Sequence, residues 1–154
     1  MTNDSERHEL LELYKLHAEL ADRVSQRREG ANRLYVGLLT GLAAFLAVLL
    51  RFGVGDLPVR VVLVLVGLVG TLLCVSWYVV LRSYRQLNTG KFLALRELES
   101  KLAYPFFRRE WDLLGEGEDR RRYWRLTVVE IGLPCLFFAL FFALLAFSVF
   151  GPGE

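Results

Sequence analysis

The stretch VVLVLVGLVGTLLCVSWYVVL, residues 61–81, has 21 consecutive positions without a charged side chain. Residues 34–50 form a second such block of 17, and residues 128–150 form a third, in which Glu130 lies near the start. A helix can cross the hydrocarbon core of a bilayer with about 20 apolar residues, and with as few as 17. A buried soluble helix could explain one block, but three blocks in 154 residues leave no polar surface to cover them. We therefore predict three transmembrane helices, at residues 34–53, 61–81 and 128–150.

The composition of the chain excludes several other classes of protein. Hydrophobic residues make up 54% of the sequence, more than an ordinary soluble domain contains. The net charge of +2 comes from 19 basic and 17 acidic residues, which excludes a strongly basic nucleic-acid-binding protein and an acidic disordered chain. Both cysteines, Cys74 and Cys135, lie inside apolar blocks, which argues against a disulfide scaffold or a zinc site.

Lysine and arginine residues indicate how the chain crosses the membrane. All of them except Arg51 and Arg60 lie in segments 1–33 and 82–127. Because positive charge is concentrated on the cytoplasmic side of membrane proteins, we expect these two segments in the cytoplasm. The loop 54–60 and the tail 151–154 are then predicted to lie outside. Four aromatic residues fall near the inner boundary, where amphipathic rings are favoured: Trp77, Tyr78, Tyr123 and Trp124.

Both polar segments contain helical patterns. Apolar residues recur at helical spacing in the first segment, at Leu10, Leu13, Leu16, Leu20 and Val24. This stripe must be buried against the second polar segment, a neighbouring subunit or the lipid surface. The lipid surface is the least favoured, because acidic residues slightly outnumber basic ones in segment 1–33. Segment 82–104 is expected to continue the helix of the second span until Pro105, and Glu99 is placed away from its apolar side. The residues after Pro105 complete a helical hairpin.

Two stretches carry a family resemblance. Residues 14–40, YKLHAELADRVSQRREGANRLYVGLLT, and residues 77–102, WYVVLRSYRQLNTGKFLALRELESKL, resemble the RipA family of small octameric bacterial inner-membrane proteins. Within them the matching elements are Ser83-Tyr84-Arg85, Leu87-Asn88, Lys91-Phe92 and Glu99, and Tyr35 departs from the pattern because a Phe pair is expected there. The resemblance implies a homo-oligomer of eight subunits and implies no reaction. Two-helix SLATT-type pore-forming effectors are similar in plan, but they lack a third span.

Small residues lie along one side of two predicted spans. They are Gly37, Gly41 and Ala44 in the first span, and Gly67 and Thr71 in the second. Such residues allow helix backbones to approach closely in lipid, and a G-x-x-x-G pair alone is a weak signal. Packing within one subunit is the favoured interpretation, with packing between subunits as the alternative.

Polar residues at two places are further candidates. Glu130 is the one carboxylate inside a predicted span, so it is a candidate for an ion or proton path, although pairing with Arg82, Arg85 or Arg125 is favoured. Below the second span, a polar helix face could bind lipid phosphates or, as we favour, hydrogen-bond to the first segment. The predicted cytoplasmic polar cluster contains Asp22, Arg23, Asn32, Tyr84, Arg85, Asn88 and Lys91.

The sequence predicts an all-α integral membrane protein: a homo-oligomeric ring with three transmembrane helices, a cytoplasmic N-terminal helix and a cytoplasmic helical hairpin. We find no pattern of residues for catalysis, a cofactor or a metal ion. The favoured function is a non-catalytic scaffold in the bacterial inner membrane that binds itself, lipids and an unidentified cytoplasmic protein, and does not bind nucleic acid. The alternative is an ion channel or pore, although few polar residues could line it: Thr40, Thr71, Ser76, Glu130 and Ser148.

Overall fold

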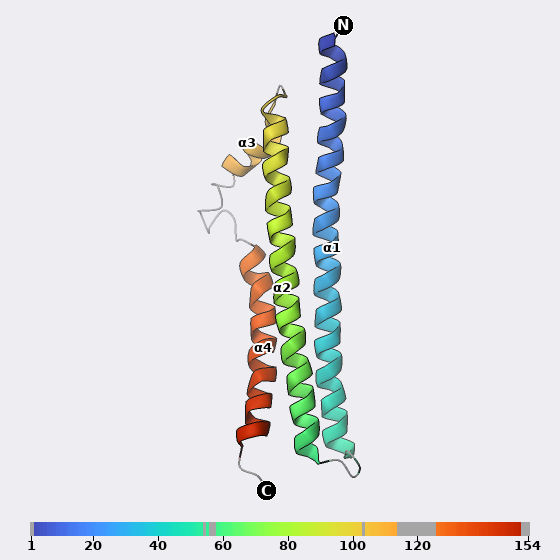
Figure 1. Cartoon of the computed structure of the whole chain (residues 1–154), viewed down its shortest axis with the longest axis vertical. Helices are drawn as coiled ribbons and strands as arrows, with labels where there is room; N and C mark the ends of the chain where they lie inside the picture. Colours follow the sequence, from blue (N-terminus) through green and yellow to red (C-terminus); the bar gives the residue numbers. More distant parts are fainter. Residues whose placement is uncertain (1, 54, 56–57, 103, 114–125, 152–154) are drawn as a thin grey trace. The chain divides into compact units, whose positions relative to one another are not determined.

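The computed structural model of the chain describes residues 2–53, 55, 58–102, 104–113 and 126–151. These residues form four helices: α1 (Thr2–Phe52), α2 (Val59–Glu99), α3 (Phe106–Leu113) and α4 (Leu126–Phe150) (Figure 1). No strand occurs among them, so the predicted all-helical class is confirmed for the described part of the chain. The predictions for Tyr123 and Trp124, for residues 54 and 56–57 of the loop and for residues 152–154 of the tail lie outside the described residues.

Three of the helices are long and apolar enough to cross a membrane. The qualifying segments are Asp4–Phe52, Val59–Glu99 and Glu130–Phe150. Each includes one of the three apolar blocks of the sequence, because unbroken apolar stretches of this length have few other stable environments. The structure therefore confirms three candidate spans.

The helices extend beyond the apolar blocks. Although Gly30 costs helix stability relative to alanine, α1 runs through it without interruption. One helix, α2, likewise covers both the second apolar block and the polar residues 82–99 that follow it. At the end of α1, Gly53 has a φ of 87° and its N–H donates to the Leu49 carbonyl at 2.9 Å. Glycine adopts this left-handed conformation without steric cost, so Gly53 ends the helix.

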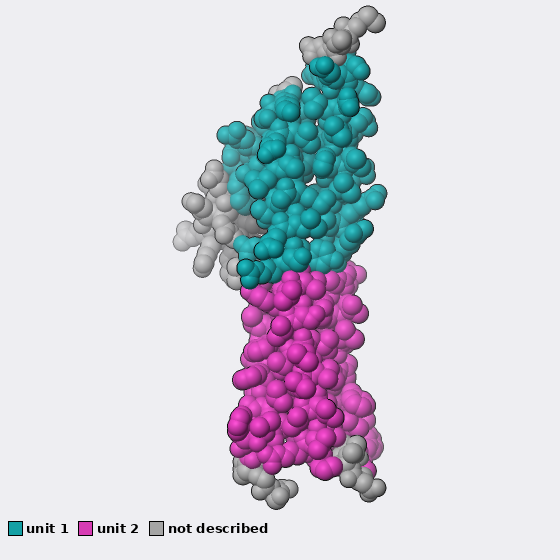
Figure 2. Space-filling view, in the orientation of Figure 1, with its two compact units in different colours: residues 1–29, 82–128 teal, residues 30–81, 129–154 magenta. Residues whose placement is uncertain are grey.

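The chain divides into two compact units (Figure 2). Unit 1 contains Met1–Glu29 and Arg82–Val128, and unit 2 contains Gly30–Leu81 and Val129–Glu154. Unit 2 includes the apolar parts of α1, α2 and α4, whereas unit 1 includes α3 and the polar parts of α1 and α2. The two units are described separately below.

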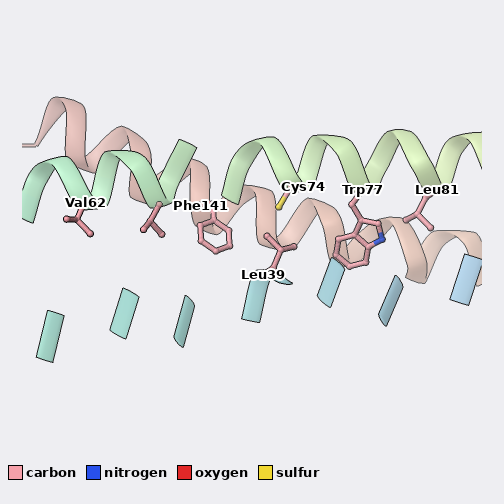
Figure 3. Packing of buried hydrophobic residues seen from close by; sticks show 7 residues of the cluster. Leu39, Val62, Cys74, Trp77, Leu81 and Phe141 are labelled. Carbon is pink, nitrogen blue, oxygen red and sulfur yellow. The ribbon is translucent and has the colours of Figure 1, made fainter. Parts of the chain in front are cut away.

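The core of unit 2 is a row of buried apolar side chains. Figure 3 shows it running along α2 between α1 and α4, and its members are Leu39, Val62, Val66, Cys74, Trp77, Leu81 and Phe141. The opposite faces of these helices remain apolar and exposed, with Phe45 at 56% and Phe147 at 67% exposure. Such surfaces would be costly in water but match the hydrocarbon of a bilayer.

Helix α4 contains an internal proline and one of the two cysteines. Pro134 lies at its ninth position and is fully buried, so proline is accommodated in the helix interior rather than in the first turn. Cys135, the next residue, is exposed, whereas Cys74 on α2 is buried in the core. Both cysteines are free thiols.

Unit 1 has a smaller core. Its buried side chains are Ala21 and Val24 of α1 together with Leu95 and Glu99 of α2. Leu13 and Leu16 of the predicted apolar stripe are 41% and 52% exposed. The stripe is therefore only partly covered within one chain: its member Val24 is buried, and Tyr14 and Ala21, which lie beside the stripe, complete the packed face of α1.

Candidate functional site

The small residues of α2 are in close contact with α4. A Cβ atom added to Gly67 would lie 2.9 Å from the Cβ of Leu145, and one added to Gly70 would overlap the ring of Phe141. Both glycines are buried. Since any larger side chain would push α4 away, Gly67 and Gly70 permit the close approach of two helices within one subunit. Thr71, the neighbouring candidate, donates from its hydroxyl to the Gly67 carbonyl at 2.7 Å.

The small residues of α1 lie in a different environment. Gly37, Gly41 and Ala44 are all exposed, and an added Cβ at either glycine would meet nothing within 4 Å. The residues of α1 that pack against the core of unit 2 include Tyr35, Leu42 and Leu46. Because each residue turns an α-helix by 100°, these three lie on the side of α1 opposite to Gly37, Gly41 and Ala44. The G-x-x-x-G face of α1 is thus available for contacts outside the subunit.

An aromatic cluster with polar groups joins α1 to α2 in unit 2. The Trp77 ring is fully buried, stacks on Tyr35 with centroids 5.8 Å apart, and donates from Nε1 to Asn32 Oδ1 at 2.9 Å. A further hydrogen bond of 2.8 Å joins the hydroxyls of Tyr35 and Ser76. Trp77 is therefore a core residue of unit 2, whereas Tyr78 is 40% exposed, and the location of both rings at the inner membrane boundary stays a prediction.

The seven residues of the predicted polar cluster do not all belong to the same unit or to the same helix face. Asn32 belongs to unit 2 and accepts the Trp77 bond, whereas the other six residues belong to unit 1. On α2, Tyr84, Asn88 and Lys91 are half-buried on the side of Leu95, and Arg85 lies on the exposed side. Asp22 accepts a bond from Gln26 on its own helix at 2.9 Å, and Arg23 is exposed.

One member of that cluster has an unsatisfied polar atom. The Oδ1 atom of Asn88 is buried and has no hydrogen-bond partner in the described part of the chain. A buried acceptor without a partner costs about 1–3 kcal/mol, so this position does not contribute to stability through its amide oxygen. We find no structural reason for the amide at this position.

The residue that organises unit 1 is Glu99. Its carboxylate is 1% exposed and accepts hydrogen bonds from the Tyr14 hydroxyl at 2.9 Å and from the backbone N–H groups of Phe107 and Arg108 at 2.7 and 3.2 Å. Those N–H groups lie in the first turn of α3 and have no partner inside the helix, so the carboxylate caps α3 and meets its positive end. Burial and then the hydrogen bond to Glu99 raise the pKa of Tyr14 to about 12.

Glu99 corrects a prediction from the sequence. It was placed away from the apolar side of the helix, but its position four residues after the fully buried Leu95 puts it nearly on the same face. This spacing from Leu95 is the feature of the sequence that could have predicted the burial of Glu99. Aromatic rings surround the contact, because Phe107 lies 6.0 Å from Tyr14 and 5.7 Å from Phe92 between ring centroids.

Arg60 was also missed as a contact residue. Its guanidinium donates to the carbonyls of Ser148 and Val149 at 2.7 and 2.6 Å, in the last turn of α4. The last carbonyls of a helix have no partners within it and carry partial negative charge, so a cation here stabilises the helix end. Glu130, near the other end of α4, is half-buried, and its proposed role stays a prediction.

These features define a class of protein and then a family. Three apolar spans and a separate polar helical unit make the chain an all-helical membrane protein. Residues 11–150 match the model of the octameric membrane protein family (8xMP), and the chain belongs to this family. The family's name indicates self-assembly of eight copies in a membrane. No curated protein and no solved structure matches the chain significantly.

Proposed function

We propose that the protein is a non-catalytic scaffold in the bacterial inner membrane, assembled as a ring of eight copies, with segments 1–33 and 82–127 in the cytoplasm. Membership in the octameric family supports the self-assembly. The concentration of lysine and arginine in these two segments supports their orientation. The narrower relation to the RipA family also remains part of this proposal.

The observation that carries the proposal is the exposed small-residue face of α1. Gly67 and Gly70 are used inside the subunit, whereas Gly37 and Gly41 have open space above them. Helices in lipid associate through close packing rather than through the hydrophobic effect, so a face of small residues favours contact with another helix. We infer that this face contacts a neighbouring copy of the chain.

The interaction surface of the scaffold would be in unit 1. Its exposed apolar side chains include Leu13 and Leu16 on α1 and Phe106 and Leu113 on α3, with exposed fractions from 41% to 64%. In a segment placed in the cytoplasm these groups would face water, and exposed apolar side chains there favour a partner. The unidentified cytoplasmic partner is proposed to bind here.

The hydroxyl groups of the apolar helices argue against the channel alternative. Thr40 donates to the carbonyls of Val36 and Gly37, and Ser148 donates to the carbonyl of Leu145. Thr71 and Ser76 are likewise bonded inside the subunit. Hydroxyl protons that are donated within the subunit are not available to water in a lumen, so the apolar helices offer few free donors to line one.

Native mass spectrometry of the particle extracted in mild detergent tests the assembly. We expect eight copies for the unmodified chain and smaller species for Gly41→Leu. Ala43→Leu is the matched control, because Ala43 is also exposed on α1 but lies on a different side of the helix. An unchanged particle in Gly41→Leu would remove the α1 face from the interface.

Ion flux into liposomes separates the scaffold from the channel. A scaffold gives no flux above that of empty liposomes. Flux that Glu130→Gln alters would establish an ion path through α4 and would refute the scaffold proposal.

A further inference from the structure

A shallow cavity in unit 1 is lined by polar side chains of α2. Its volume is about 320 Å³, and Arg82, Arg85, Gln86 and Thr89 line it. The spacing of three, four and seven residues from Arg82 places all four side chains on one face of the helix. All four are exposed, so the cavity opens at the surface of the unit.

Several cations have a partner within the described residues, and the two arginines of this cavity do not. Arg60 donates to helix carbonyls, Arg96 lies over the Trp111 ring, and Lys15 pairs with Glu12. Within the described part of unit 1, neither Arg82 nor Arg85 has an ion-pair partner. Two adjacent guanidinium groups repel one another, so an anion between them would be favoured.

Arg82 directly follows residues 61–81, the longest uncharged stretch in the chain. When that stretch fills the hydrocarbon core of a bilayer, the next residues along the helix reach the depth of the lipid headgroups. Basic residues immediately beyond a transmembrane helix attract anionic lipids. The position in the sequence therefore favours a lipid phosphate over a phosphate dissolved in the cytoplasm.

We propose that the Arg82 cluster (Arg82, Arg85, Gln86 and Thr89) binds the phosphate of an anionic phospholipid. A guanidinium group presents parallel N–H donors that match two phosphate oxygens, and the Gln86 amide supplies one further donor. Thr89 also lines the cavity, and its hydroxyl donates to the Arg85 carbonyl at 3.0 Å. The proposal does not depend on the scaffold function, since a channel could bind the same lipid.

The test uses the full-length protein reconstituted in phosphatidylcholine bilayers. Trace spin-labelled phosphatidylglycerol or spin-labelled phosphatidylcholine is added, and electron paramagnetic resonance measures the fraction of each label immobilised by the protein. We expect the unmodified protein to prefer phosphatidylglycerol. Arg82→Gln and Arg85→Gln should each lower that preference about fivefold, and the double variant should remove it.

Two further variants separate a built site from general surface charge. Arg108→Gln with Arg109→Gln removes the same charge from exposed positions on α3 and should leave the preference intact. Arg82→Lys with Arg85→Lys keeps the charge but removes the paired guanidinium donors, so it should retain only part of the preference. The particle mass and circular dichroism of every variant are compared with those of the unmodified protein to confirm folding.

Three results would overturn the proposal. One is an undiminished preference in the double glutamine variant. Another is an equal loss in the α3 control, since the attraction would then belong to the whole basic surface. The third is saturable binding of inorganic phosphate that requires Arg82 and Arg85, in a protein without any preference for phosphatidylglycerol. The occupant of the cavity would then be a soluble phosphate.

Discussion

Replacing Glu99 by alanine should release α3 from unit 1. The carboxylate holds two backbone N–H groups of α3 and the Tyr14 hydroxyl of α1, so its removal breaks three hydrogen bonds at once. A hydrogen bond to a charged group contributes about 1.5–3 kcal/mol. Counting only the two bonds shorter than 3 Å, at the low end of that range, the loss is about 3 kcal/mol.

Such a loss can be measured as hydrogen–deuterium exchange in the full-length protein in detergent. A change of about 3 kcal/mol in the opening free energy corresponds to roughly 100-fold faster exchange. We expect this acceleration in peptides that cover α3 and in peptides that contain Tyr14. Glu99→Gln should give a smaller acceleration, because its amide oxygen can still accept a hydrogen bond but carries no charge for the helix end.

Glu97→Ala is the control for this experiment. Glu97 is exposed two residues earlier on α2, and its carbonyl, which accepts the Ser100 hydroxyl, is kept in the alanine variant. Its effect should stay below about 0.5 kcal/mol. Exchange in α3 within twofold of the unmodified protein for Glu99→Ala, or equal acceleration in both variants, would refute the capping role of Glu99.

Three other predictions address individual contacts. Tyr14, with its pKa of about 12, should keep its proton at pH 11 in an ultraviolet absorbance titration. Because that pKa is raised above the ordinary 10.0, the contribution of Tyr14 to stability is present below pH 10 and is lost as the pH rises toward 12. Titration of Tyr14 at the ordinary pKa would contradict its buried contact with Glu99. Gly70→Ala should lower stability in an SDS titration by about 1–3 kcal/mol through overlap with Phe141, whereas Gly37→Ala should not. Asn88→Leu should leave the protein as stable or more stable in the same assay, and a clear loss would mean that the amide has a partner.

The spans could be predicted from the sequence because membrane crossing depends on length and hydropathy alone. The rotation of each helix about its axis could not be predicted so well. In a span that is apolar on every side, no amphipathic pattern distinguishes the face toward another helix from the face toward lipid. For this reason the burial of Trp77 in the unit 2 core could not be predicted from the sequence.

The same limit applies to the glycines. Gly41 and Gly67 have similar sequence surroundings, but one has open space and the other touches Leu145. That difference depends on where α4 lies, which no local pattern encodes. The burial of Glu99 could not be predicted for another reason. Its hydrogen-bond partners lie on α1 and on the first turn of α3, and without them a buried carboxylate is unfavourable.

The exposure of Cys135 and the burial of Cys74 give the natural chain a built-in chemical reporter. A small maleimide that enters the membrane should modify Cys135 far faster than Cys74, without any engineered cysteine. If eight copies close around α4, assembly would shield that thiol, and dissociation would restore its labelling. The rate of modification therefore reports whether the side of α4 that carries Cys135 faces a neighbour.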